Sequence, residues 1–573
     1  MADLTKPNKS VQKLILLAGA VFLICRAPYG YSFTDEPFII TLGQRLSYGD
    51  ALIVNEWNLV QSIAPVLLLF YRLYHAFFTS NTGIILSFRY CYCILWFLTC
   101  LTVYLALRKQ YDYTIWVFLF LILFAPFDIM SLSYKSFGVM CSLLLASAAF
   151  NRDRIENRLL ILLISFILCL FTLACPYCGI FFVAAMCFGI IMNLKGKQFW
   201  NNRSIFICLT ITLLLALTYL YVFIFQKYSF QKMLETLPYI FKDPERVMSW
   251  EERFAYISDT LFRLAGKCKL YTVILAITLV LALFKNKTRR FRLHIFAVAC
   301  AGYLFALVSY FAHGLFATFN YEVIDIALLG MVAFLLLDRK PWNLFMSFTV
   351  IGCVYILADS MMSSNSGLHE LAMDSLTAGV SGIVYIVELC RELEREQEKG
   401  WKHKFLLALC SMILLAQIGT QGLTRIGRQF WDSSPLKCTD TIEVGACKGL
   451  RTTESRKKEY SSNYETLRTL LNTAHVASND KFLSLHPDPV QYLNAERPFA
   501  TFSAWSIDYD EDSLPVQLSK YYENTPEMVP DAIFALQKDD LKYLNQHISG
   551  IDMDDYVGYS FEDSSMFVRR DSR

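Results

Sequence analysis

Residues 204–225 read SIFICLTITLLLALTYLYVFIF and contain no charged side chain. Their length is close to the roughly 20 residues that an α-helix needs to cross the hydrocarbon core of a bilayer. Residues 342–361 form a second stretch of similar length and mostly apolar character. These two stretches predict a chain that crosses a membrane more than once.

The apolar excess extends over the whole chain of 573 residues. Hydrophobic residues make up 55% and charged residues 18% of it, against roughly 45–50% and about 25% in a soluble domain. The net charge of +3, without a basic tail or helix-turn-helix pattern, does not indicate a nucleic-acid partner. The sequence contains no Walker A, GxGxxG or HExxH motif, so it predicts no ATPase, no soluble nucleotide-sugar enzyme and no cofactor.

The topology follows from where the basic residues lie. About fourteen stretches are apolar enough to be helices, and 60–78 is the weakest because it contains Gln61, Pro65, Arg72 and His75. If 60–78 lies at the outer interface instead of crossing, the basic loops all become cytoplasmic, as the positive-inside rule requires. The prediction is therefore about thirteen spans with a cytoplasmic N-terminus and the C-terminal region outside.

Two domains are expected. Residues 1–424 form the transmembrane domain, with outer loops over 30–80 and 226–268. Residues 425–573 are more polar, with strand-like runs at 481–485 and 532–536, a helical pattern from Tyr460 to Leu471 and a helix over 538–547. The predicted fold class is an all-α polytopic membrane protein with a C-terminal extracytoplasmic α/β domain, placed in a cell membrane.

The 17 cysteines are mostly within apolar stretches, where they act as small hydrophobic residues. Cys438 and Cys447 lie in the polar region, and the sequence leaves open whether they form a disulfide or are two free thiols. Cys175-Pro-Tyr-Cys178 is a CxxC without a surrounding βαβ pattern, which favours a tight turn between helices over a redox site.

The segment after the first apolar stretch reads YSFTDEP over residues 31–37 and carries two adjacent carboxylates, Asp35 and Glu36. A carboxylate beside low-dielectric lipid has a raised pKa and can act as a general base on a hydroxyl group. The alternative is helix capping, because Thr34 or Asp35 before a helix starting near Pro37 is good N-cap chemistry. The two roles are compatible.

The arrangement around Asp35 resembles the GT-C glycosyltransferases. A first span, an outer loop opening with Asp35-Glu36, the stretch QRLSYGD at 44–50 and an interfacial helix with Pro65 carry the resemblance. The Asp35-Glu36 pair is most similar to the Asp-Glu pair of the protein O-mannosyltransferase and aminoarabinose-transferase branch. The resemblance implies Asp35 as the base with Glu36 beside it, a lipid-linked sugar as donor, and inversion at the anomeric carbon. Residues 127–135 contain no DxD, so no metal is predicted.

A departing polyprenyl phosphate needs a cation to hold its charge. Lys135 is the first candidate, against the alternative of an ordinary lysine that extends to the interface from a helix end. Arg26, Arg45 and Arg89 are further candidates, and ionisable residues near a span usually face a cavity or a partner. Arg26 could instead bridge to Glu322 or Asp325 structurally.

A second polar cluster is predicted where two spans meet on the outer side. His313 ends one span, and Tyr321 and Glu322 begin the next. Asn365 lies in another outer turn, whose backbone and hydroxyl donors could contact a sugar or phosphate. The alternatives are a structural role for His313 and an ordinary turn around Asn365.

The sequence thus predicts an integral membrane glycosyltransferase that moves a sugar from a polyprenyl-phosphate donor to a glycan, lipid or protein acceptor. An O-antigen-type polymerase or ligase is the second hypothesis, since the 226–268 loop carries Arg246, Arg253 and Arg263. A transporter or flippase of lipid-linked glycans is the third, although no internal repeat is visible. Mutation of Asp35 separates the first hypothesis from the second.

Overall fold

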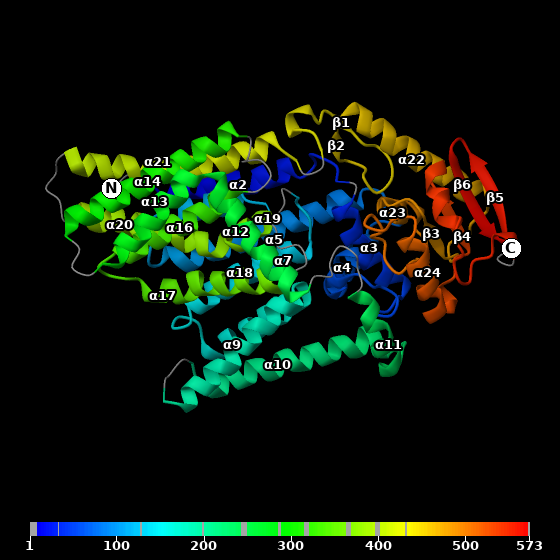
Figure 1. Cartoon of the computed structure of the whole chain (residues 1–573), viewed down its shortest axis with the longest axis horizontal. Helices are drawn as coiled ribbons and strands as arrows, with labels where there is room; N and C mark the ends of the chain where they lie inside the picture. The colour runs from blue at the N-terminus through cyan, green and yellow to red at the C-terminus, as the bar shows by residue number, and fades with distance from the viewer. Residues whose placement is uncertain are drawn as a thin grey trace.

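The computed structural model describes residues 8–32, 34–125, 129–196, 200–241, 249–284, 288–313, 320–362, 368–395, 401–429 and 432–570. The molecule is elongated, with a helical bundle at one end of its long axis and the C-terminal domain at the other (Figure 1). Helices that lie along the long axis make up the bundle, as expected for a membrane domain.

The bundle contains both long spans and shorter helices. Seven helices in the described part of the chain are long and apolar enough to cross a membrane, or up to eight if the bent pair of α12 (Trp250–Lys267) and α13 (Lys269–Leu283) is one span. The polytopic membrane class is thereby confirmed, whereas the predicted total of about thirteen stays a prediction. The bundle elements are α2 (Lys9–Arg26), α5 (Ile84–Arg108), α6 (Ile115–Ile122), α7 (Tyr134–Phe150), α8 (Asn157–Ala174), α9 (Pro176–Leu194), α10 (Asn202–Leu220), η3 (Tyr221–Phe225), α13 (Lys269–Leu283), α14 (Arg289–Ala312), α16 (Tyr321–Leu336), α17 (Trp342–Leu344), η4 (Phe345–Thr349), α18 (Val350–Met362), α19 (Leu368–Asp374), α20 (Leu376–Arg395) and α21 (Trp401–Gly427).

The most extensive helix–helix contact is between α16 and α20, which pack at backbone contact. A Cβ atom added to Gly330 would lie 2.1 Å from the Cα atom of Gly382. Small residues at such crossings allow close van der Waals packing between membrane helices. Both helices are almost fully buried, so this contact fixes the core around which the other helices are placed.

Residues 60–78 form the short helices η1 (Leu59–Ile63) and α4 (Ala64–His75). Twelve residues at about 1.5 Å each are too short to cross a bilayer. One face of α4 packs on α3 (Asp35–Tyr48), while Leu69, Leu73 and Phe77 are exposed. This amphipathic character is what the predicted interfacial placement requires.

The second loop region contains two amphipathic helices, α11 (Phe230–Ile240) and α12 (Trp250–Lys267). α12 meets α13 at an angle of 102°. Phe230, Phe254 and Phe262 are exposed on these helices, and α11 lies beside the C-terminal domain in Figure 1. The Lys232 ammonium donates to the carbonyl of Asn524, which ties α11 to that domain.

The C-terminal domain is built on a four-stranded sheet of order β3-β4-β6-β5. β3 and β4 are parallel, with Leu483 opposite Ile533, and the other pairs are antiparallel. The two predicted strands and the helix around Tyr460 are confirmed, whereas the helix predicted over 538–547 is a 3-10 helix, η7, that ends at Leu544. The elements are η5 (Pro435–Lys437), β1 (Asp440–Thr441), β2 (Arg451–Thr452), α22 (Glu454–Thr473), β3 (Phe482–Ser484), α23 (Val490–Ala495), α24 (Ser513–Asn524), η6 (Pro526–Met528), β4 (Ala532–Ala535), η7 (Lys538–Leu544), η8 (Met553–Asp555), β5 (Tyr556–Phe561) and β6 (Ser564–Arg569).

The structure tests both predictions about the cysteines. Cys438 and Cys447 are both buried free thiols, so the free-thiol alternative holds. Cys175 ends α8 and precedes Pro176 at the start of α9. The predicted tight turn between two helices is therefore present at Cys175, and Pro176 to Cys178 form the first turn of α9, with proline at a first helical position where its missing N–H costs nothing.

Candidate functional site

Asp35 is the first residue of α3, directly after the turn that follows the first bundle helix. Its side chain is partly buried, and the Thr34 hydroxyl donates to its Oδ2 atom at 3.0 Å. Thr34 occupies the N-cap position but makes no capping bond with its side chain. Asp35 and Glu36 thus stand in the first turn of the helix, where the exposed backbone N–H groups stabilise negative charge.

The turn that presents Asp35 is held by the C-terminal domain. The N–H of Gly30 donates to the carbonyl of Arg451, and the N–H of Arg451 donates to that of Pro28, both at 2.7 Å. Gly30 has a φ of 84°, and a Cβ atom there would lie 2.0 Å from the side chain of Gln429. Glycine is therefore required for the chain to turn beneath this domain.

Glu36 faces away from solvent and pairs with Arg89 of α5. Two parallel contacts of 2.7 Å join the guanidinium to both carboxylate oxygens, and each side chain is 1% exposed. The remaining N–H groups of Arg89 donate to the carbonyls of Ala27, Tyr29 and Gly30. Such a bidentate pair in a low-dielectric interior positions α3 on α5.

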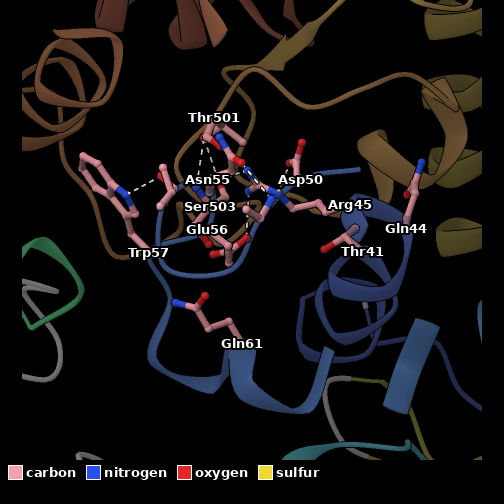
Figure 2. A network of polar contacts seen from close by, with 12 residues as sticks. Thr41, Gln44, Arg45, Asp50, Asn55, Glu56, Trp57, Gln61, Thr501 and Ser503 are labelled. Atoms are coloured by element: carbon pink, nitrogen blue, oxygen red, sulfur yellow. Dashed lines mark hydrogen bonds and ion pairs between the residues drawn. The ribbon is translucent and has the colours of Figure 1, made fainter. Parts of the chain in front are cut away.

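Arg45 links the first loop to the C-terminal domain, as Figure 2 shows. Its guanidinium contacts Asp50 at 2.8 Å and Glu56 at 2.7 Å, and donates to the carbonyl of Thr501 at 2.7 Å. It also donates to the carbonyl of Asn55 and lies over the ring of Phe499, 5.0 Å from its centroid. All of these contacts are inside the protein.

Arg26 stands at the end of α2 and binds the end of α21. Its guanidinium donates to the carbonyls of Arg425 and Arg428, each at 2.9 Å, and to Gln429 Oε1 at 2.7 Å. A cation against the last carbonyls of a helix is favourable for the helix dipole. This contact joins the first bundle helix to the last one.

Lys135 is fully buried at the start of α7. Its ammonium binds Asp359 of α18 and lies 3.5 Å from Glu370 of α19. Asp359 also accepts a 2.7 Å hydrogen bond from the Tyr177 hydroxyl, and the buried Asp374 is next to it. One ammonium thus faces three carboxyl groups, which is an environment that attracts protons or cations rather than a phosphate.

The predicted second cluster is only partly described. Tyr321 and Glu322 begin α16 and are buried, 1% and 0% exposed, and the ring of Tyr321 lies 5.4 Å from that of Tyr310. His313 follows α14, is exposed and contacts the carbonyl of Ser309 at 2.7 Å. Asn365 lies outside the described residues. Tyr321 and Glu322 are adjacent in one buried helix start, which His313 does not share.

A polar cavity of about 220 Å³ lies where the turn before α3 meets the C-terminal domain. The membrane domain contributes Tyr31 and Thr34, and α22, the loop before α23 and the start of η7 contribute most of the rest. The lining residues are Tyr31, Thr34, Arg456, Glu459, Tyr460, Asn463, His486, Pro487, Asp488, Gln491, Asn494, Ile507 and Gln537. Because Thr34 is bonded to Asp35, this cavity stands one hydrogen bond from the predicted base.

Sequence reasoning missed Asp488, which has the most unusual chemistry in this cavity. Burial raises the pKa of Asp488 to about 7, against the pull of an N–H bond from Val490 and a hydrogen bond from the Tyr31 hydroxyl. A carboxyl with a strongly shifted pKa in a cleft is typical of functional sites. The available signal was HPDP at 486–489, where an aspartate stands between two prolines and a histidine precedes them.

His486 is held in place by a buried carboxylate. Its Nδ1 atom lies 3.2 Å from Oδ2 of Asp540, which accepts the backbone N–H groups of Leu536 and Gln537. Within the described ranges, no group of three or more His, Cys, Asp or Glu side chains is arranged to hold a metal ion. The prediction of metal-independent chemistry stays a prediction.

Comparison with known proteins gives structural matches but no sequence match. No family model and no curated protein matches the chain. The crystal structure of ArnT from Cupriavidus metallidurans, bound to undecaprenyl phosphate, matches over 98% of each chain with 8% sequence identity and a TM-score of 0.48. At this distance the match carries no conclusion about the activity of this chain.

Proposed function

We propose that this protein is a membrane glycosyltransferase that takes a sugar from a polyprenyl-phosphate carrier. One observation carries the proposal. Asp35 stands at the junction of the membrane bundle and the C-terminal domain, in the first turn of a helix and one hydrogen bond from a polar cavity. A carboxylate in this place can meet a lipid-linked donor from the bilayer and an acceptor from the aqueous side.

In the proposed reaction the acceptor hydroxyl loses its proton to the carboxylate of Asp35. Its oxygen attacks the anomeric carbon from the face opposite the phosphate, and the bond from carbon to the phosphate oxygen breaks. The polyprenyl phosphate leaves with the bonding electron pair, and the anomeric centre is inverted. Proton removal by a positioned group contributes typically about 10²–10⁴-fold to such a rate.

Glu36 has a positioning role in this proposal. Its pair with Arg89 is buried and bidentate, so it fixes the first turn of α3 and with it the direction of Asp35. The role of Lys135, Arg26, Arg45 and Arg89 at the donor phosphate stays a prediction. Their contacts with carboxylates and backbone carbonyls favour structural roles. Tyr321, Glu322, His313 and Asn365 likewise stay predicted substrate contacts.

The proposed location is a cell membrane with the N-terminus cytoplasmic and the cavity on the outer side. The alternative of an arginine-dependent polymerase rests on the loop 226–268. Arg246 lies outside the described residues, Arg253 is partly exposed on α12, and Arg263 pairs with Asp259 on the surface of that helix. These contacts place no buried cationic site in the described part of the loop.

The test is sugar transfer in proteoliposomes. The purified full-length protein is supplied with a panel of polyprenyl-phosphate sugars labelled in the sugar, together with membrane extracts as acceptors. We expect transfer from one donor by the wild type and by Asp563→Asn, an exposed control carboxylate, with loss in Asp35→Asn. An unchanged rate of transfer in Asp35→Asn would contradict the assignment of Asp35 as the base. Absence of transfer by the wild type with every donor would contradict the proposed transferase function.

A further inference from the structure

The cavity beside Asp35 has a lining suited to a hydroxyl-rich group. Four amide side chains, those of Asn463, Gln491, Asn494 and Gln537, border it together with the rings of Tyr31 and Tyr460. Amides offer both donors and acceptors, as sugar hydroxyl groups do. Apolar faces with a few fixed polar groups are typical of small-molecule sites.

The charges around the cavity nearly cancel. Arg456 stands against Glu459 and Asp488, and its guanidinium donates to the carbonyl of Tyr31 and lies 3.7 Å from the buried Asp432. A phosphate would meet the two carboxyl groups of Glu459 and Asp488 here, and a cation would meet the guanidinium of Arg456. A neutral ligand avoids the electrostatic repulsion that either charged ligand would meet.

Asp488 is the polar group that the cavity leaves ready for a ligand. One of its oxygens accepts the N–H of Val490 at 2.9 Å, and the Tyr31 hydroxyl donates to the carboxyl group. A carboxylate has about four acceptor positions, so these two bonds leave capacity for hydroxyl groups of a ligand. The prolines on either side of Asp488 and the pair formed by His486 and Asp540 restrict the loop that carries it.

We propose that this cavity is the acceptor site, that it binds a neutral sugar unit, and that Asp488 accepts hydrogen bonds from the sugar hydroxyl groups. The assignment of the sugar as an acceptor rests on the proposed function; the binding of the sugar does not. The C-terminal domain then selects the acceptor, while Asp35 from the membrane domain acts on its hydroxyl.

Direct binding tests this proposal without requiring transfer. Saturation-transfer difference NMR on the full-length protein in nanodiscs would be recorded with a panel of methyl glycosides, with methyl phosphate as the anionic comparison. We expect signals from at least one glycoside and none from methyl phosphate. Asp488→Asn should weaken binding by about tenfold or more, because a bond to a charged acceptor is replaced by a neutral one.

Two further variants separate binding from folding and from catalysis. Asn463→Leu removes a second proposed contact without touching Asp488 and should also lose the signal, while Asp35→Asn should retain it. A circular dichroism melt identical to wild type shows that each variant is folded. Signals that persist in both cavity variants, or absence of binding by every glycoside, would overturn the proposal. Failure of transfer with binding intact would count against the proposed function alone.

The pH dependence gives an independent outcome. The groups that face Asp488 are Tyr31 from the membrane domain, His486 on its own loop, and Arg456 and Glu459 on α22. With a pKa near 7 for Asp488, the ionised form increases between pH 6 and pH 8, so glycoside affinity should rise across this interval. The rise should be absent in Asp488→Asn, and an unchanged rise in that variant would contradict the role of Asp488.

Discussion

At the scale of single residues, two carboxyl groups near the junction between the domains, those of Glu36 and Asp488, have different environments. Glu36 is held by Arg89 in a buried bidentate pair, whereas burial of Asp488 raises its pKa to about 7. A carboxyl group with a pKa near neutrality can take up and release protons at neutral pH, as acid and base chemistry requires. Both environments come from residues distant in sequence, which the fold brings together.

Asp488 should make the stability of the folded protein fall as the pH rises from about 4 to about 7. The pKa of Asp488 in the folded state, about 7, lies above the ordinary aspartate pKa of about 3.9, so between these values the folded state keeps a proton that the unfolded state releases. Stability therefore falls as pH rises through this window, by roughly 2–4 kcal/mol. Apparent melting temperatures measured from pH 5 to pH 8 should fall less in Asp488→Asn than in wild type. Parallel curves for the two proteins would contradict the raised pKa.

Removal of one charge from the ion pair of Glu36 and Arg89 should destabilise the folded protein. Glu36→Gln leaves a buried guanidinium without its anion, for which a loss of about 3–5 kcal/mol is expected. The measurement is the melting temperature by fluorescence-detected gel filtration, with Glu454→Gln on the exposed face of α22 as the control. A Glu36→Gln protein as stable as the control would exclude the structural role.

At the scale of elements, helix packing explains what the sequence pattern could and could not predict. The apolar runs around Ser204 and Trp342 and the strands near Leu483 and Ile533 follow from composition and periodicity, and the structure contains them. The partners of Lys135 and Arg26 could not be predicted, because Asp359 and the carbonyl of Arg428 are hundreds of residues away in sequence. The cavity around Asp488 was missed for the same reason.

The crossing of α16 and α20 depends on glycine. A methyl group at Gly330 would collide with the Cα atom of Gly382 at 2.1 Å, so Gly330→Ala must push the helices apart. We expect a loss of about 1–3 kcal/mol or more. Gly419→Ala on α21 is the matched control, since nothing lies within 4 Å of its added Cβ atom. Equal melting temperatures for the two variants would contradict this packing.

At the scale of the whole molecule, the loop after α3 joins the two domains into one body. Trp57 is 3% exposed and packs in the core of the C-terminal domain, with the rings of Tyr239 at 4.8 Å and Tyr521 at 5.3 Å from its own. Its backbone N–H donates to the carbonyl of Phe502 at 2.8 Å. The first loop is therefore part of the core of the C-terminal domain.

Removal of the Trp57 side chain should loosen the junction. Trp57→Ala is expected to cost about 3–5 kcal/mol, and hydrogen exchange in peptides from 500–525 should increase. Trp250→Ala provides the control, because that side chain is 58% exposed. Unchanged protection in Trp57→Ala would mean that the C-terminal domain is held independently of the loop.

The central claim is that Asp35 removes the proton from the acceptor hydroxyl. The most direct measurement is the single-turnover rate of sugar transfer from the identified polyprenyl-phosphate donor, comparing wild type with Asp35→Asn at saturating donor. The account predicts a fall of about 10²–10⁴-fold in rate, with donor binding and melting temperature unchanged. A rate within about twofold of wild type would contradict it.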